Sequence, residues 1–295
     1  MGSRRLALVV ASAALLLVGC SESRPAVEPP TPSSPRASEP EPTTPDFPTV
    51  DTYVAIGDSF TAGPGLADLQ AGSGRCLRST RNWPSLLARQ LGPRDFDDVS
   101  CAGASTAGVL RGGGLTGSAQ IDAVSSGTDL VTVGVGGNDG NLFASLISAC
   151  TGGDGACGAF ARDRAPVILD ETASRITEVL EGVRANAPAA TVLLVGYLAI
   201  MPESGTCEAI GIPEGDAAAV VRTEDALDEA LATAADRAGV GYVSMRTTSR
   251  GHDACAGRAA WTNGRAMSDD DGIVFHPRLA GMRAVANAVA AELAG

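Results

Sequence analysis

Four short stretches of the chain contain side chains that could do chemistry together. The first is Gly57-Asp58-Ser59, where a serine follows closely on the apolar run from Tyr53 to Ile56. An apolar run of this length predicts a buried strand, and open α/β sheets place their sites at the carboxyl edge of such strands. A serine at that edge can act as a nucleophile, because backbone N–H groups around it are free to hold an oxyanion. The alternative is that Asp58 and Ser59 only cap the next helix.

The other three stretches supply groups that would complement a serine nucleophile. Gly103 follows a predicted strand at 97–101, and a glycine there lets the backbone come close to a ligand. Asn138 follows the glycines that end a predicted strand at 129–135, and it offers a side-chain amide. His276 is one of two histidines and stands just before the last predicted helix. A nucleophile, a base and two hydrogen-bond donors on one rim of a parallel sheet are what acyl transfer requires.

Alternating strand and helix patterns predict the elements that would hold these residues. Short apolar runs predict strands at 52–57, 97–101, 129–135, 191–196 and 240–244. Helical periodicity predicts helices at 83–91, 118–126, 166–187, 216–238 and 278–294. Strands separated by helices favour a parallel sheet that is covered on both faces. We therefore expect one α/β domain over 51–295, with glycine-rich loops at 61–75, 111–118 and 151–158.

The first fifty residues predict export and anchoring rather than a folded unit. Residues 1–19 hold two arginines followed by a continuous apolar stretch, which is typical of a signal peptide. The stretch ends in Leu-Val-Gly-Cys, which resembles the lipobox of bacterial lipoproteins and implies that Cys20 is lipidated. Residues 20–50 are rich in proline and predict a disordered tether. We expect the domain to be lipid-anchored on the outer face of the bacterial cell membrane, with an ordinary secreted protein as the alternative.

Composition restricts the partners and indicates the redox compartment. The net charge is −12 and all 22 basic residues are arginine, so no basic patch is expected to meet the phosphates of a nucleic acid. Cys20 apart, an even set of cysteines in an exported chain predicts disulfides, although their pairing stays open. A zinc site is disfavoured, because the chain has no Cys-x-x-Cys and two histidines. We expect neither a metal ion nor a cofactor. The remaining cysteines are Cys76, Cys101, Cys150, Cys157, Cys207 and Cys255.

The four stretches together resemble the conserved blocks of the SGNH hydrolases, also called GDSL esterases and lipases. In the family's order, the blocks here are Gly57-Asp58-Ser59-Phe60, Gly103, Gly136-Gly137-Asn138-Asp139 and His276-Pro277. The longer Gly-Asp-Ser-Phe-Thr-Ala-Gly opening and the six cysteines look most like secreted actinobacterial members. The resemblance implies a flavodoxin-like three-layer α/β/α sandwich with a central parallel sheet. It also implies three disulfides, namely Cys76–Cys101, Cys150–Cys157 and Cys207–Cys255.

The resemblance further implies a role for each site residue. Ser59 would attack the ester carbonyl, and His276 would take its proton as general base. The Ser59 N–H, the Gly103 N–H and the Asn138 side chain would hold the oxyanion. The chain would then be an extracytoplasmic serine esterase or lipase that acts, as a monomer, on small-molecule or lipid esters. The rival α/β-hydrolase fold is disfavoured, because the chain contains no Gly-x-Ser-x-Gly.

The sequence departs from the family pattern at the residue that would orient His276. The family usually has an acid three residues before the histidine, where this chain has Ile273. Asp271 lies five residues before the histidine, too far to reach its ring from an extended loop. We therefore expect a Ser–His dyad in which the imidazole donates to the backbone carbonyl of Ile273 or Val274, with Asp271 less favoured. A neutral acceptor stabilises the imidazolium less than a carboxylate would.

Two other functions and one other base remain open. A catalytically silent relative would bind a lipid or a glycan, although the intact Ser59, Asn138 and His276 speak against it. A deacetylase of O-acetylated glycans would keep the same site and would need an open, polar cleft. His252 is a second candidate base next to Asp253, but adjacent residues orient each other's side chains poorly.

Overall fold

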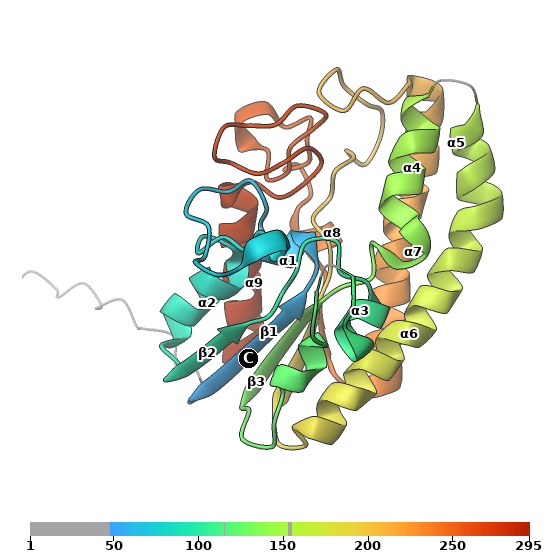
Figure 1. The fold of residues 1–295 in the computed structure, drawn as a ribbon. Helices are drawn as coiled ribbons and strands as arrows, with labels where there is room; N and C mark the ends of the chain where they lie inside the picture. The colour runs from blue at the N-terminus through green and yellow to red at the C-terminus, as the bar shows by residue number, and fades with distance from the viewer. Residues whose placement is uncertain (1–47, 115, 153–154) are drawn as a thin grey trace, which may run out of the picture. The chain divides into compact units, whose positions relative to one another are not determined.

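A five-stranded parallel sheet forms the centre of the fold (Figure 1). The computed structural model describes residues 48–295, apart from 115, 153 and 154. The strand order is β2-β1-β3-β4-β5, and every pairing is parallel. The predicted signal peptide, Cys20 and all but the end of the tether lie outside the described residues. The strands are β1 (Thr52–Gly57), β2 (Asp95–Asp98), β3 (Leu130–Gly134), β4 (Thr191–Val195) and β5 (Gly241–Val243).

Helices cover both faces of the sheet, which makes three layers (Figure 1). On one face, α2 (Trp83–Leu91) and α9 (Leu279–Ala294) pack over a core that includes Tyr53 and Leu130. On the other face, long helices pack over a core that includes Val54 and Val131. Because adjacent residues of a strand point to opposite faces, both faces of β1 and β3 are apolar. The helices on this second face are α3 (Thr106–Arg111), α6 (Ala165–Asn186) and α7 (Glu214–Ala238).

This architecture confirms the predicted α/β/α sandwich with a central parallel sheet. Strands β1, β3, β4 and β5 and helices α2, α6, α7 and α9 lie within two residues of their predicted bounds at each end. Five other α-helices among the described residues were missed, and four of them span six residues or fewer, which is too short to show helical periodicity. These are α1 (Ser59–Ala62), α3, α4 (Leu142–Thr151), α5 (Ala156–Ala159) and α8 (Met245–Thr248).

Two predicted elements were placed wrongly. The helix predicted at 118–126 is only a 3₁₀ turn over Gln120–Ala123. The Gln120 side chain is drawn inward, where it donates to the Gly57 carbonyl at 3.0 Å and accepts from the Gly57 N–H at 2.8 Å. The strand predicted at 97–101 begins and ends earlier, as β2, because this edge strand is polar and its boundary is not marked by apolar residues.

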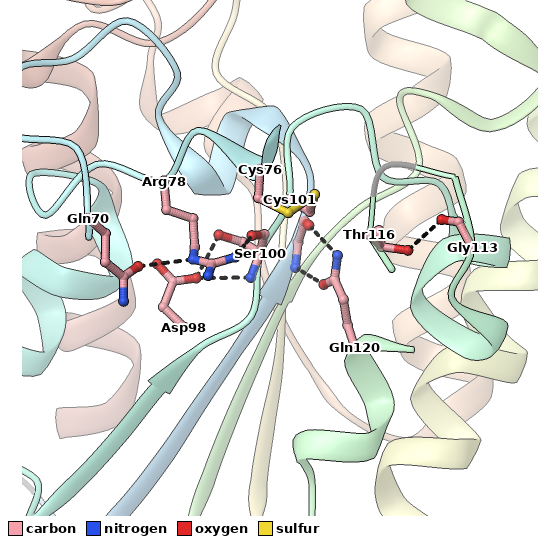
Figure 2. The surroundings of a disulfide bond; sticks show 10 residues. Gln70, Cys76, Arg78, Asp98, Ser100, Cys101, Gly113, Thr116 and Gln120 are labelled. Atoms are coloured by element: carbon pink, nitrogen blue, oxygen red, sulfur yellow. Dashed lines mark hydrogen bonds between the residues drawn. A yellow bond between two sulfur atoms is a disulfide. The ribbon is translucent and has the colours of Figure 1, made fainter. Parts of the chain in front are cut away.

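Three disulfides join cysteines in the pairs that the family resemblance implied. They are Cys76–Cys101, Cys150–Cys157 and Cys207–Cys255. Figure 2 shows the first of them, which joins the loop before α2 to the chain just after β2. Arg78 supports the same junction by donating to the Ser100 carbonyl at 2.7 Å. Three disulfides are typical of a protein that folds in an oxidising compartment.

Among the residues that the structure describes, no helix combines the length and the apolar composition that crossing a bilayer requires.

The carboxyl ends of β1 and β3 lie side by side, and each ends in a glycine. Gly57 pairs with Gly134 in the register, and the Asp58 N–H donates to the Gly134 carbonyl at 2.9 Å. The Thr61 side chain fills the space above both glycines. A Cβ on Gly57 would lie 2.2 Å from Thr61 Oγ1 and 2.4 Å from Thr61 Cβ, and a Cβ on Gly134 would lie 2.5 Å from Thr61 Oγ1. Glycine is therefore required at both strand ends so that α1 can sit close to the sheet.

We predict that Gly57→Ala and Gly134→Ala each lower the free energy of unfolding by about 1–3 kcal/mol, because overpacking forces the neighbouring groups apart. A further substitution, Thr61→Ala, combined with each of these variants, distinguishes the two sites. It should partly restore stability to Gly134→Ala, since the close atom there is Oγ1, but not to Gly57→Ala, where Thr61 Cβ itself is too close. Urea unfolding of the single and double variants measures this, and equal rescue at both positions would contradict the packing described.

Candidate active site

The turn after β1 presents Ser59 at the carboxyl edge of the sheet. Asp58 caps α1, and its Oδ1 accepts from the Phe60 N–H at 2.9 Å. Gly63 ends this single helical turn in the left-handed conformation, with a φ of 72°. Ser59 is therefore the first residue of a short helix and is partly exposed. Asp58 thus caps the helix, as one interpretation of this motif predicts, and the Ser59 side chain takes no part in the cap.

His276 reaches Ser59 from the far end of the chain. Its Nε2 lies 2.8 Å from Ser59 Oγ, and its Nδ1 lies 2.7 Å from the carbonyl oxygen of Val274. A carbonyl oxygen can only accept a hydrogen bond, so Nδ1 must carry the proton in the neutral ring. Nε2 then has a free lone pair directed at the Ser59 hydroxyl. This is the tautomer that a general base for Ser59 requires.

Of the two carbonyls that the sequence offered as acceptors, the imidazole of His276 bonds that of Val274, and the prediction of Ile273 is wrong. Phe275, which lies between Val274 and His276, has a φ of 55°, so the chain turns back sharply and the Val274 carbonyl faces the imidazole ring. The Ile273 carbonyl instead accepts from the backbone N–H of His276 at 3.2 Å and from the Asn263 amide at 3.3 Å. A left-handed phenylalanine is uncommon, and nothing in the sequence pattern announces it.

Asp271 is engaged elsewhere and does not contact the histidine ring. Its Oδ1 accepts from the Leu279 N–H at 2.6 Å, and its Oδ2 accepts from Arg278 Nε at 2.8 Å. Leu279 is the first residue of α9. The carboxylate therefore satisfies a free N–H at the start of that helix, where a negative charge is favourable. Asp271 fixes the helix that follows the histidine, and not the histidine itself.

The environment of the imidazole favours its neutral form. Burial lowers the pKa of His276 below its ordinary value of 6.5, and the hydrogen bond to the Val274 carbonyl opposes this. The Phe60 ring lies beside the imidazole, with 5.1 Å between the ring centroids. An apolar neighbour stabilises no positive charge by hydrogen bonding, so the ring is held ready to accept a proton at neutral pH.

Three hydrogen-bond donors, one of them the N–H of Ser59 itself, lie in the turns that follow the neighbouring strands β2, β1 and β3. In the described part of the chain, neither the Ser59 N–H nor the Gly103 N–H has a protein acceptor. Asn138 donates one amide hydrogen to the Ala104 carbonyl at 2.9 Å, which leaves the other available. The Cys101 N–H donates to the Gly57 carbonyl at 3.0 Å, which ties the Gly103 loop to the end of β1. Hydrogen bonds thus tie the Gly103 loop to the end of β1 on one side and to the Asn138 side chain on the other.

Two buried carboxyl groups hold these loops together. Asp139 accepts from the Thr106 N–H at 3.0 Å and from the Thr106 hydroxyl at 2.7 Å, which joins the Asn138 turn to α3. Asp58 accepts from the hydroxyl of Tyr197 at 2.5 Å. Burial raises the pKa of Asp58 from 3.8 to about 7, with hydrogen bonds from Tyr197 and from the Phe60 backbone opposing the rise. Each carboxyl group is therefore structural, and neither contacts His276.

Sequence reasoning missed Tyr197, which lies in the middle of this arrangement. The tyrosine follows β4 by two residues, so it stands at the same carboxyl edge as Ser59. Its ring packs against Phe60 and Phe143, with ring centroids 5.0 Å apart in both pairs. The rule that strand ends gather at one edge of a parallel sheet could have identified it.

His252 has another role in the fold and does not contact Ser59. Its ring stacks on Trp261, with ring centroids 4.0 Å apart and an interplanar angle of 2°. Its Nδ1 lies 2.8 Å from the Ala259 carbonyl. Of the two histidines, only His276 is thus in contact with the serine hydroxyl.

We predict that Asp271→Asn leaves the pKa of His276 nearly unchanged, because the carboxylate bonds Arg278 and Leu279 rather than the ring. Titration of the two histidines by NMR measures this, and His252→Asn assigns the signals. The wild-type pKa should lie below 6.5. A carboxylate that oriented the ring would raise its pKa by roughly one unit or more. A fall of that size in Asp271→Asn would show that Asp271 does act on His276.

Comparison with known proteins agrees with this geometry. Residues 55–284 match the GDSL-like lipase/acylhydrolase family. Lipase 2 of Streptomyces coelicolor is 38% identical over 219 residues, which cover 70% of this chain and 74% of that protein.

Two solved structures share the fold over most of their length. A crystal structure of phospholipase A1 from Streptomyces albidoflavus has a TM-score of 0.72 and 29% identity, and the match covers 83% of this chain and 100% of that one. A crystal structure of an extracellular lipase from Streptomyces rimosus has a TM-score of 0.72 and 30% identity, with 83% and 99% covered. From the family match and the identity to these lipases, the chain belongs to the GDSL-like lipase/acylhydrolase family and is a carboxylic-ester hydrolase.

Proposed function

We propose that the protein hydrolyses esters through a covalent acyl-enzyme on Ser59, with His276 as the general base. The observation that carries the proposal is the contact of 2.8 Å between Nε2 and Oγ, in a ring whose Nδ1 must be protonated. As Ser59 Oγ bonds to the ester carbonyl carbon, its proton passes to Nε2. The C–O bond to the alcohol then breaks, and the imidazolium returns the proton to the leaving oxygen. Water, deprotonated by His276, then attacks the acyl carbon, the bond from that carbon to Ser59 Oγ breaks, and the imidazolium returns its proton to Oγ, which releases the carboxylic acid.

The developing negative charge on the carbonyl oxygen would be held by the donors of Ser59, Gly103 and Asn138. Two of these are backbone N–H groups with no protein acceptor among the described residues, and the third is the remaining amide hydrogen of Asn138. Donors fixed before the reaction stabilise the oxyanion without reorganisation. Losing one such donor typically costs about 2.7–4 kcal/mol of transition-state stabilisation.

The site works as a dyad in this proposal. The Val274 carbonyl orients the imidazole but carries no full charge, so it stabilises the imidazolium less than a carboxylate would.

We further propose that the enzyme is exported and held at the outer face of the cell membrane by lipidated Cys20. Three disulfides support an oxidising compartment, and the lipobox-like Leu-Val-Gly-Cys supports the anchor. Lipid esters at or near that surface are then the substrates of first choice, in keeping with relatives named lipase and phospholipase A1. A deacetylase of O-acetylated glycans is the second candidate, because it would use the same Ser59–His276 pair.

Hydrolysis of a series of p-nitrophenyl esters, from acetate to palmitate, tests the proposal. The wild type should cleave some of the series, and Ser59→Ala should lose activity by about 10⁴-fold or more. Maximal activity on long acyl chains favours the lipase, and maximal activity on acetate favours the deacetylase. An inactive wild type that binds lipid or glycan would instead indicate a catalytically silent relative. Mass spectrometry of the intact protein after a fluorophosphonate probe, with Ser59→Ala as control, locates the nucleophile directly.

The pH dependence of kcat/KM tests the role of His276. A base must be neutral to accept a proton, and burial lowers the pKa of His276 below 6.5. The rate should therefore be constant near neutral pH and fall only below that lowered pKa, by about tenfold for each pH unit. A profile between about pH 4 and 8 measures this with a neutral ester. A flat profile over the whole range would contradict His276 as the base.

A further inference from the structure

Tyr197 packs beside Phe60, the residue that follows the proposed nucleophile, and is largely buried. Its side chain is 8% exposed, and its ring is packed between Phe60 and Phe143. Phe60 follows the nucleophile directly, and its ring in turn lies beside His276. A tyrosine buried in this way needs hydrogen-bond partners for its hydroxyl, since an unpaired buried hydroxyl is costly.

The Tyr197 hydroxyl has two partners, one from each side of the site. The Gly137 N–H lies 2.7 Å from the tyrosine oxygen, and Asp58 Oδ2 lies 2.5 Å from it. An N–H can only donate, so the tyrosine oxygen accepts from Gly137 and its own hydrogen goes to Asp58. The other oxygen of Asp58 accepts from the Phe60 N–H at 2.9 Å. The Tyr197 hydroxyl therefore joins Asp58, which precedes Ser59, to Gly137, which precedes Asn138.

The Gly137 end of this connection sets the backbone of Asn138. The Gly137 carbonyl accepts from the Phe143 N–H at 3.1 Å, so both polar groups of this glycine are fixed. A Cβ on Gly137 would lie 2.0 Å from the Phe143 ring, so the chain passes too close to the ring for any other residue. The Asn138 side chain then projects from a backbone held by Tyr197 and Phe143, and its amide reaches the Ala104 carbonyl at 2.9 Å.

From these contacts we infer that Tyr197 is a positioning residue, which holds the Asn138 amide in register with Ser59 for the oxyanion. The inference rests on the proposed function, because it assumes that Asn138 is an oxyanion donor. Tyr197 does not touch the substrate and acts only through the turn at Gly137 and the cap at Asp58.

Tyr197→Phe removes one oxygen and keeps the ring packed. The Gly137 N–H and Asp58 Oδ2 then lose their shared partner inside the protein, and the turn must move or admit water to satisfy them. A displacement of about 1 Å in a catalytic donor can reduce a rate by about 100-fold. We therefore expect kcat to fall by about tenfold or more, while KM changes by less than about threefold, because substrate binding does not use Tyr197.

A double-mutant cycle with Asn138→Ala distinguishes positioning from a general structural role. If Tyr197 acts through Asn138, the double variant should be no slower than Asn138→Ala alone, because the donor that Tyr197 positions is already gone. If the rate losses of Tyr197→Phe and Asn138→Ala multiply in the double variant, the inference is overturned. An unchanged kcat in Tyr197→Phe would also overturn it.

Tyr242→Phe is the matched control. The Tyr242 hydroxyl also donates to a carboxylate, Asp228 Oδ1, at 2.5 Å, and Ser244 bonds the same carboxylate. This pair lies at β5 and has no hydrogen bond to the Asn138 turn. The control should lose a comparable tyrosine–aspartate hydrogen bond and keep its kcat. A fall in kcat equal to that of Tyr197→Phe would overturn the inference.

Ser59→Ala separates failure of this inference from failure of the proposed function. If Ser59→Ala retains activity, the proposed mechanism is wrong and the cycle with Asn138 loses its premise. If Ser59→Ala is inactive but Tyr197→Phe has the wild-type kcat, the positioning inference alone is wrong.

Asp58→Asn tests the other end of the connection if Tyr197→Phe does not fold, as judged by thermal unfolding. Its amide cannot accept the tyrosine hydrogen while its oxygen still accepts from Phe60. It should show the same loss of kcat and the same lack of additivity with Asn138→Ala. A wild-type kcat in Asp58→Asn would overturn the inference.

Discussion

The parallel pairing of β1 and β3 with their carboxyl ends in register is the constraint on which the site depends. Gly57 lies opposite Gly134, and the next N–H along, that of Asp58, still bonds to the Gly134 carbonyl. The two strands therefore leave the sheet at the same level, one toward Ser59 and the other toward Asn138. A shift of one residue would exchange the faces of every side chain in the strand and would change the placement of Ser59 relative to Asn138. The two glycines and Thr61 allow the serine turn to lie directly on this junction.

Strand ends and their chemistry were predictable from the sequence, because both depend on local composition. A run such as Tyr53 to Ile56 is apolar on both faces, and its abrupt end in Gly57 marks the edge of the sheet. The predicted helix at 118–126 failed for a nonlocal reason. Gln120 turns inward to satisfy both backbone groups of Gly57, and its partner lies 63 residues away. Local periodicity carries no information about such a contact.

The candidate site likewise has residues that the sequence predicts and one contact that it does not. Ser59, Gly103, Asn138 and His276 were identifiable because each residue type has a distinct chemical use at a strand end or helix start. The acceptor for the histidine ring was not, since it is a backbone carbonyl and any residue has one. The choice of Val274 depends on the left-handed Phe275, whose φ of 55° no residue-type rule predicts for a phenylalanine.

In the proposed mechanism, the surroundings of His276 limit how well its charged form is stabilised. A Val274 carbonyl gives the imidazolium less support than a carboxylate, and Phe60 beside the ring gives it no hydrogen bond. Burial makes the charged ring less stable, and the Val274 hydrogen bond offsets this only in part, so the neutral base is favoured at neutral pH. The cost falls on the transition state, in which the ring is positive. Electrostatic stabilisation must then come mainly from the oxyanion side, where the donors depend on fixed backbone geometry. In the proposed mechanism, a rigid oxyanion site would complement a histidine without a carboxylate, and the buried contacts around Asp58 and Asp139 would supply that rigidity.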